Sequence, residues 1–295
     1  MRKIDSTSRG FTLLEFVVGL AIFTILLGII LPFTFSVRER ERRTRCGDNL
    51  RKIGLALTQY GTDNRYEMPR VVYDEKEMPH SYTAYSGADA SDPFTGAVRP
   101  NDVTASLWLL VRSNYISSEY SPSSSAFICP SSGDVADRLT DSDGRHVGAR
   151  ERGNFRGPLY LSYSYASPFS NASGYGLKSD FLPNDFVLLA DKNPGKLGPR
   201  QDVTGWDAKA GPMELKVANS RNHGGAGQSV LFGDMHVEFR STPYCGVSGD
   251  NIYTALAREP ITTGEAPVFR SKGYLGREVG PAWPTDSYLV PTESD

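Results

Sequence analysis

The sequence is short of net charge, of cysteine and of recognisable catalytic motifs. Its 32 basic and 34 acidic side chains give a formal net charge of −2 and a pI near 6.1, so it carries no electrostatic footprint of a nucleic-acid partner. Three cysteines are compatible with one disulfide and one further thiol in an oxidising compartment. There is no H-E-x-x-H zinc motif and no nucleophile elbow, so we expect no enzymatic activity.

One long apolar segment is present, at residues 16–35. Between Phe11 and Val37 the one ionisable side chain is Glu15, and about twenty helical residues reach roughly the 30 Å of a hydrocarbon core. We therefore predict a membrane-spanning and assembly helix over residues 11–37. A cleaved secretory signal fits less well, because the apolar run exceeds a normal signal core and no A-x-A site follows it.

Glu15 is the unusual residue of this helix. A carboxylate near the membrane interior costs a few kcal/mol unless it is paired. Cleavage after Gly10 would give Phe11 a new α-amino group about one helical turn from Glu15, in the same chain or in a neighbouring subunit. The chain's own processing would thus supply the cation that Glu15 needs.

The run Gly10-Phe11-Thr12-Leu13-Leu14-Glu15 resembles the processing site of type IV prepilins and type II secretion pseudopilins. The resemblance implies a leader at residues 1–10, cleavage between Gly10 and Phe11 by a prepilin peptidase, N-methylation of Phe11, and a role for Glu15 in assembly. It also implies partnership with other pilin or pseudopilin subunits, with a secretion or pilus assembly platform, and with the inner membrane. An ordinary signal anchor with a chance glutamate is the alternative.

The resemblance also sets the expected topology. The flanking basic residues do not decide it, because the far side of the span has the larger excess of arginine. We expect a single pass through the inner membrane with the C-terminal domain extracytoplasmic, in the periplasm or on a surface fibre. Pro32 is expected to kink the helix, as a comparable break does in pilins.

The helix is predicted to continue as an amphipathic segment over residues 38–62. Glu39 with Arg43, and Glu41 with Arg45, are i,i+4 pairs of a solvated surface. Beyond them, an apolar stripe at helical spacing is predicted to lie against the domain; its members are Cys46, Leu50, Ile53, Leu57 and Tyr60.

Residues 63–295 are predicted to form a globular α+β domain with an antiparallel sheet. Short apolar runs predict a weak strand at 71–73, strands at 159–165 and 186–190, and a hairpin at 228–240. Asp102 or Thr104 is expected to cap a short helix through residues 107–111. Residues 82–101 and 140–157 are predicted to be long surface loops.

The hairpin carries a second resemblance, to a bacterial pilin-like family with a domain of unknown function and a closing His-to-Asp-Gly signature. The signature spans Asn222-His223-Gly224-Gly225 and residues 230–239. The sequence departs from it twice: ten residues rather than nine separate His223 from Asp234, and Met235 replaces the glycine after the aspartate. The turn is therefore expected to place its positive φ at Gly233 or Asp234.

His223, Asp234 and His236 have the side chains of a zinc or acid-base site, but two ligands in one turn make a weak signal. We interpret these residues as structural, tying loop backbone together, and predict no metal and no cofactor. Asp141 begins a faint calcium-loop pattern, yet Arg152 stands at the twelfth position of the loop, where a glutamate is expected. Calcium, which some pseudopilins bind, remains a minor expectation.

The motifs around Cys46, Cys129 and Cys245 also resemble those of the second family. In its shorter members the first two motifs recur without the third, so the resemblance implies a disulfide between Cys46 and Cys129. Cys245 is the alternative partner of Cys129. The Cys46–Cys129 bridge would close a loop of more than eighty residues and stabilise the domain by about 4–5 kcal/mol at most.

The function predicted from the sequence is a pilin-like structural subunit, of the pseudopilin type, that assembles into a pseudopilus or surface fibre. The alternative is a membrane-anchored binding module whose exposed aromatic side chains capture a polysaccharide or a partner in the cell envelope. An anchored hydrolase ranks third.

Overall fold

The structure is a computed structural model. It describes residues 12–28, 37–76, 82–116, 125–140, 143–195, 211–255 and 280–293, and the backbone alone of residues 29–36, 123–124, 201–202, 256 and 273–275. The predictions for the leader, Gly10, Phe11, Pro32 and Asp141 concern positions outside the fully described residues. The chain divides into two compact units, residues 1–41 and 42–295, and helix α1 (Leu13–Asp63) contributes to both.

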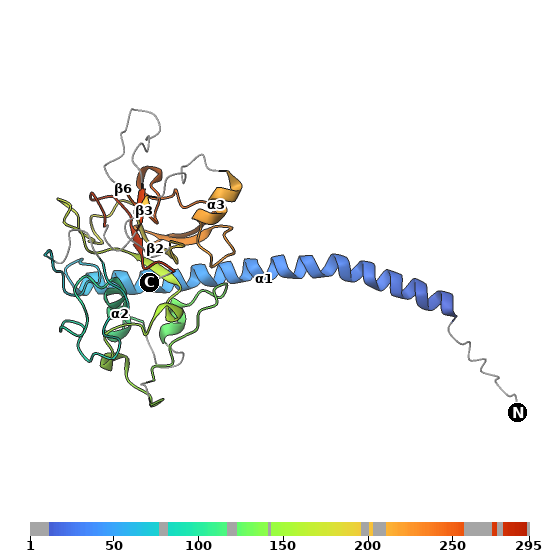
Figure 1. Cartoon of the computed structure of the whole chain (residues 1–295), viewed down its shortest axis with the longest axis horizontal. Helices are drawn as coiled ribbons and strands as arrows, with labels where there is room; N and C mark the ends of the chain where they lie inside the picture. Colours follow the sequence, from blue (N-terminus) through green and yellow to red (C-terminus); the bar gives the residue numbers. More distant parts are fainter. Residues whose placement is uncertain are drawn as a thin grey trace, which may run out of the picture. The chain divides into compact units, whose positions relative to one another are not determined.

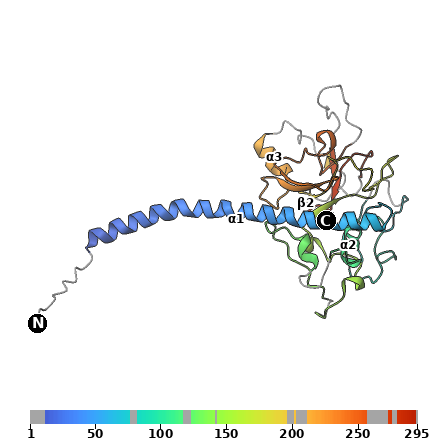
Figure 2. The ribbon, with the colours of Figure 1, turned by 180° about the vertical axis from the view of Figure 1, so that it is seen from behind.

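In the second unit, α1 buries the apolar stripe that the sequence predicted. Cys46, Leu50, Ile53 and Leu57 are fully buried in the core. Glycines let the helix approach the hairpin strands, since a Cβ at Gly54 would lie 3.0 Å from Leu231. Figures 1 and 2 show α2 and α3 on opposite sides of this part of α1.

The core of the second unit contains a five-stranded antiparallel sheet, as predicted. Its order is β5-β4-β2-β1-β8. The bounds are β1 (Tyr163–Ala166), β2 (Val187–Asp191), β4 (Gln228–Phe232), β5 (Val237–Arg240) and β8 (Leu289–Val290). A second antiparallel sheet has the order β3-β7-β6, with β3 (Gln201–Asp202), β6 (Ala255–Leu256) and β7 (Gly273–Leu275). The α+β fold class is confirmed.

The other helices are short. The α-helices are α2 (Val103–Arg112) and α3 (Pro212–Ala218), and the 3-10 turns are η1 (Ser123–Phe127), η2 (Ala149–Glu151), η3 (Pro158–Tyr160) and η4 (Val247–Gly249). The cap predicted at Asp102 is confirmed, because its carboxylate accepts a hydrogen bond from the backbone N–H of Ala105 at 2.8 Å.

The predicted strand at residues 71–73 is wrong. The backbone N–H of Val71 donates to the hydroxyl of Ser106, and the carbonyl of Val72 accepts from the N–H of Asn101. These bonds attach the segment to the start of α2, so its backbone groups do not pair with a strand.

The hairpin forms where it was predicted, but its turn differs. The positive φ falls on Met235, at +69°, rather than on Gly233 or Asp234. Gly233 is held in an ordinary conformation because its N–H donates to the carbonyl of Phe186 at 2.7 Å, which ties the turn to the residue before β2.

Candidate functional site

The first described turn of α1 is closed by Thr12 and Glu15. The backbone N–H and the hydroxyl of Thr12 both donate to Oε2 of Glu15 at 2.9 Å, and the N–H of Glu15 donates to the hydroxyl of Thr12 at 3.3 Å. This reciprocal arrangement is a capping box. The side chain of Glu15 therefore caps the start of α1, apart from any role of its negative charge.

The helix that follows this turn is apolar on every side. Exposed apolar side chains occur at nearly every position through residue 27; they are Leu13, Leu14, Phe16, Val17, Val18, Leu20, Ile22, Phe23, Ile25, Leu26 and Leu27. A helix that is apolar all round normally has its surface covered by lipid or by other helices.

A second candidate site lies inside the second unit, where four side chains converge. Cys46 comes from α1, Cys129 from the segment after η1, Asp191 from the last position of β2, and His223 from the turn before β4. Their ligand atoms all lie within 4.8 Å of one another, and all four residues are buried. We call these four residues the Cys/Asp/His cluster.

Close contacts connect the members of the cluster. The thiol of Cys46 donates to Oδ1 of Asp191 at 3.0 Å. Nε2 of His223 lies 3.2 Å from Oδ2 of Asp191 and 3.6 Å from Sγ of Cys129. The ring of His223 also meets the ring of Phe239 edge to face, so the imidazole is held by both polar and apolar neighbours.

The carboxylate of Asp191 accepts hydrogen bonds from within the cluster and from residues outside it. Its Oδ2 accepts from the backbone N–H of Ser229 at 2.6 Å, and its Oδ1 accepts from the side-chain amide of Asn222 at 3.0 Å. Asn222 comes from the turn that carries His223, and Ser229 comes from β4, which follows that turn. The carboxylate is thus oriented by donors outside the cluster.

The electrostatics of the cluster follow from burial and from the Asp191 carboxylate. Burial opposes the charged form of His223, but hydrogen bonding to Asp191 and Cys46 outweighs it and raises the pKa of His223 to about 10. Burial, with the neighbouring Cys129 and Asp191, raises the pKa of the Cys46 thiol well above its usual value. Without a metal, His223 is therefore held as an imidazolium and the Cys46 thiol is held in its neutral form.

The predicted disulfide between Cys46 and Cys129 is not present. Cys46, Cys129 and Cys245 are all free thiols. The two cysteines lie close together, as the resemblance implied, with sulfur atoms no more than 4.8 Å apart. Sγ of Cys46 contacts Asp191 and Sγ of Cys129 contacts His223. Cys245 does not belong to the cluster, and burial raises its pKa to about 12.

The structure separates the three residues of the hairpin motif. His223 lies in the buried cluster, whereas Asp234 and His236 lie together in the turn, where the N–H of His236 donates to Oδ1 of Asp234 at 3.1 Å. The ring of His236 stacks on Phe232. The residue that sequence reasoning missed is Asp191, whose one signal was its position at the end of a buried strand.

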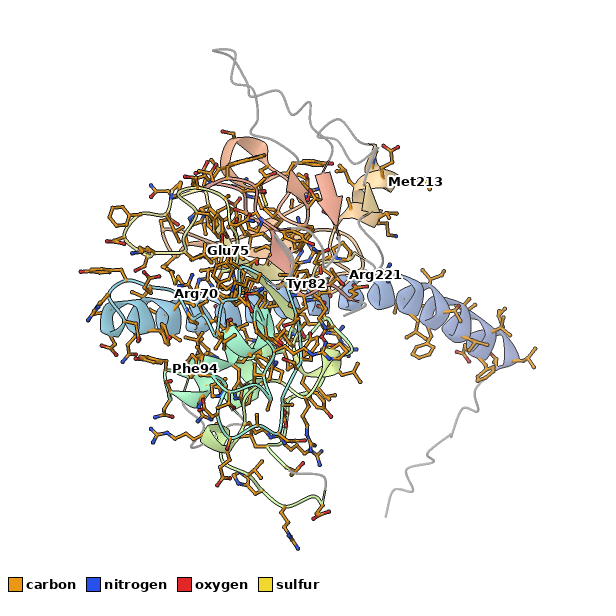
Figure 3. The ribbon with its side chains drawn as sticks, turned by 60° about the vertical axis from the view of Figure 1, so that its left-hand side comes forward. Arg70, Glu75, Tyr82, Phe94, Met213 and Arg221 are labelled. Atoms are coloured by element: carbon orange, nitrogen blue, oxygen red, sulfur yellow. The ribbon has the colours of Figure 1, made fainter. Side chains whose placement is uncertain are left out.

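The exposed apolar side chains of the second unit include Phe94, which lies on a loop, and Met213, which lies on α3. Tyr82 and Trp108 are buried, while Phe94 and Met213 are exposed. Figure 3 shows Phe94 and Met213 on opposite sides of the second unit. These two exposed side chains therefore lie apart.

Comparison with known proteins identifies the N-terminal segment. Residues 5–31 match the family described as the prokaryotic N-terminal methylation motif. The match supports a prepilin-like protein whose N-terminal segment is processed and anchored in a membrane. No curated protein and no solved structure matches the chain. Among the residues that the structure describes, no helix is both long enough and apolar enough to cross a membrane.

Proposed function

We propose that the chain is a pseudopilin-type subunit that is cut after Gly10, methylated at Phe11 and assembled through α1 into a pseudopilus or surface fibre. The observation that carries the proposal is the methylation motif over residues 5–31. In the proposed topology the protein crosses the inner membrane once and its second unit is extracytoplasmic. The filament would belong to a type II secretion or type IV pilus system.

The apolar surface of the first unit supports this proposal. Its exposed apolar side chains would contact lipid before assembly and would pack against the helices of neighbouring subunits after assembly. Within such a surface, the carboxylate of Glu15 would pair with the new amine of Phe11 in its own chain or in the next subunit.

The capping box allows the charge of Glu15 to be tested apart from its structural task. Glu15→Gln keeps an acceptor for Thr12, because glutamine also completes a capping box, but it removes the charge. We expect this variant to be cleaved and inserted normally and to yield at least tenfold less filament in sheared or crosslinked fractions. Glu15→Val, which removes both features, should assemble no better.

Two further variants separate processing from assembly. Gly10→Val should block cleavage, which intact mass and N-terminal sequencing of membrane protein would detect. Thr12→Ala weakens the capping box without changing charge, so it should be cleaved and should assemble better than Glu15→Gln. Normal-length mature protein from Gly10→Val would refute the prepilin assignment, and wild-type assembly of Glu15→Gln would refute the charge pairing.

A further inference from the structure

We propose that Cys46, Cys129, Asp191 and His223 form a tetrahedral site for a thiophilic divalent cation, with Zn²⁺ as the ion that fits best. The ligands come from four separate segments of the second unit, so the ion would fasten α1 to the sheet. This inference does not depend on processing or filament assembly.

The distances agree with such a site. For Zn–S near 2.3 Å and Zn–N or Zn–O near 2.0 Å, the ligand atoms of a tetrahedron are about 3.3–3.8 Å apart. The separations in the cluster are 3.0 Å from Sγ of Cys46 to Oδ1 of Asp191, 3.2 Å from Oδ2 of Asp191 to Nε2 of His223 and 3.6 Å from Nε2 of His223 to Sγ of Cys129. All four ligand atoms lie within 4.8 Å of one another, so side-chain shifts of about 1 Å or less would admit the ion.

The surroundings of the ligands agree as well. Ligating carboxylates in metal sites are oriented by further hydrogen bonds, and Asp191 accepts such bonds from Asn222 and from the N–H of Ser229. The hydroxyl of Tyr163 donates to Sγ of Cys46 at 3.4 Å, which would stabilise that sulfur as a thiolate. Each donor lies outside the four ligands and holds one of them in place.

The donor set selects the kind of ion. Two sulfurs with an imidazole and a carboxylate favour Zn²⁺ over Mg²⁺ or Ca²⁺, which prefer oxygen ligands. On binding, each thiol would lose its proton, and His223 would release one proton and bind as the neutral imidazole. All four residues are buried, and four protein ligands without an open position are typical of a structural zinc site.

The test uses the full chain in detergent, reduced and stripped of metal under anaerobic conditions. We expect it to bind one equivalent of Co²⁺ with the thiolate-to-cobalt charge-transfer band and visible spectrum of a tetrahedral site, and we expect Zn²⁺ to displace the cobalt. X-ray absorption of the zinc form should count two sulfur and two nitrogen or oxygen ligands.

Cys245 provides the matched control, because it is a free thiol outside the cluster. Cys46→Ser and Cys129→Ser should each lose about half of the charge-transfer intensity, whereas Cys245→Ser should keep all of it. Asn222→Ala, which removes one donor to Asp191, should weaken affinity about 10–100-fold while leaving the cobalt spectrum tetrahedral. Circular dichroism checks that each variant is folded.

Three results would overturn the proposal, and two of them need no variant. The first is a reduced, folded wild-type chain that binds no Co²⁺ or Zn²⁺. The second is a peptide linking Cys46 to Cys129 in protein isolated with its thiols blocked at lysis, because a disulfide would leave no thiolate ligands. The third is metal binding that is lost in Cys245→Ser as readily as in Cys129→Ser.

Discussion

Asp250 and Asp286 are two carboxyl groups buried side by side outside the Cys/Asp/His cluster. Both residues are almost completely inaccessible to solvent, and Asp286 accepts a hydrogen bond from the N–H of Ala282 at 2.8 Å. Burial, and then the neighbouring Asp286, raise the pKa of Asp250 well above its usual value. A single shared proton would allow the two groups to coexist in the core.

This pair predicts a definite pH dependence. Because the pKa of Asp250 is raised in the folded state, its effect on stability is most favourable below the unfolded pKa of about 3.9 and is lost as pH rises toward the folded value. The loss amounts to about 1.4 kcal/mol per pH unit for each proton retained by the fold. Asp250→Asn cannot ionise, so its free energy of unfolding should fall less than that of the wild type between pH 5 and pH 7.

Urea unfolding of the detergent-solubilised full chain at both pH values measures this difference. Asp286→Asn serves as the partner control and should relieve the same repulsion, so the double variant should gain less than the sum of the two single variants. Identical pH slopes for Asp250→Asn and the wild type would contradict the shared-proton arrangement.

At the scale of elements, the hairpin shows how tertiary contact decides a turn that local sequence leaves open. The sequence offered Gly233 for the positive φ. Its backbone adopts an ordinary conformation instead, because its N–H donates to the carbonyl of Phe186 and residues 182–183 pack close to it. Met235 adopts the left-handed conformation instead. Gly233 is required for space rather than for conformational freedom.

We therefore expect Gly233→Ala to destabilise the fold by about 1–3 kcal/mol, as overpacking does. Its new Cβ would lie 2.4 Å from the carbonyl oxygen of Pro183 and 3.3 Å from Cβ of Leu182. Gly96→Ala is the control, because nothing lies within 4 Å of the corresponding Cβ, and it should change stability by about 0.5 kcal/mol or less. Equal shifts in the thermal midpoints of the two variants would show that Gly233 is not constrained.

At the scale of the whole molecule, local patterns predicted the elements but not the site. The stripe on α1, the cap at Asp102 and the hairpin strands each depend on residues a few positions apart, so their spacing carries the signal. The ligands of the cluster lie at positions 46, 129, 191 and 223, and tertiary packing alone brings them together. The helical stripe predicted that Cys46 faces the domain, and the family resemblance implied that it lies near Cys129, but neither gave a partner for His223.

The cluster joins segments that are distant in sequence, so metal binding should stabilise the second unit as a whole. At free Zn²⁺ of about 100 times the dissociation constant, a ligand that binds only the folded state adds about 2.7 kcal/mol, which slows globally exchanging amides about 100-fold. Hydrogen exchange of the reduced full chain should show this slowing in residues 46–57 of α1, which include the buried stripe, and in β2 and β4, which are buried throughout. The first turn of α1, in the separate first unit, should exchange equally fast with zinc and with chelator. Slowing confined to the immediate neighbours of His223 would mean that the ion orders only a local turn and does not fasten α1 to the sheet.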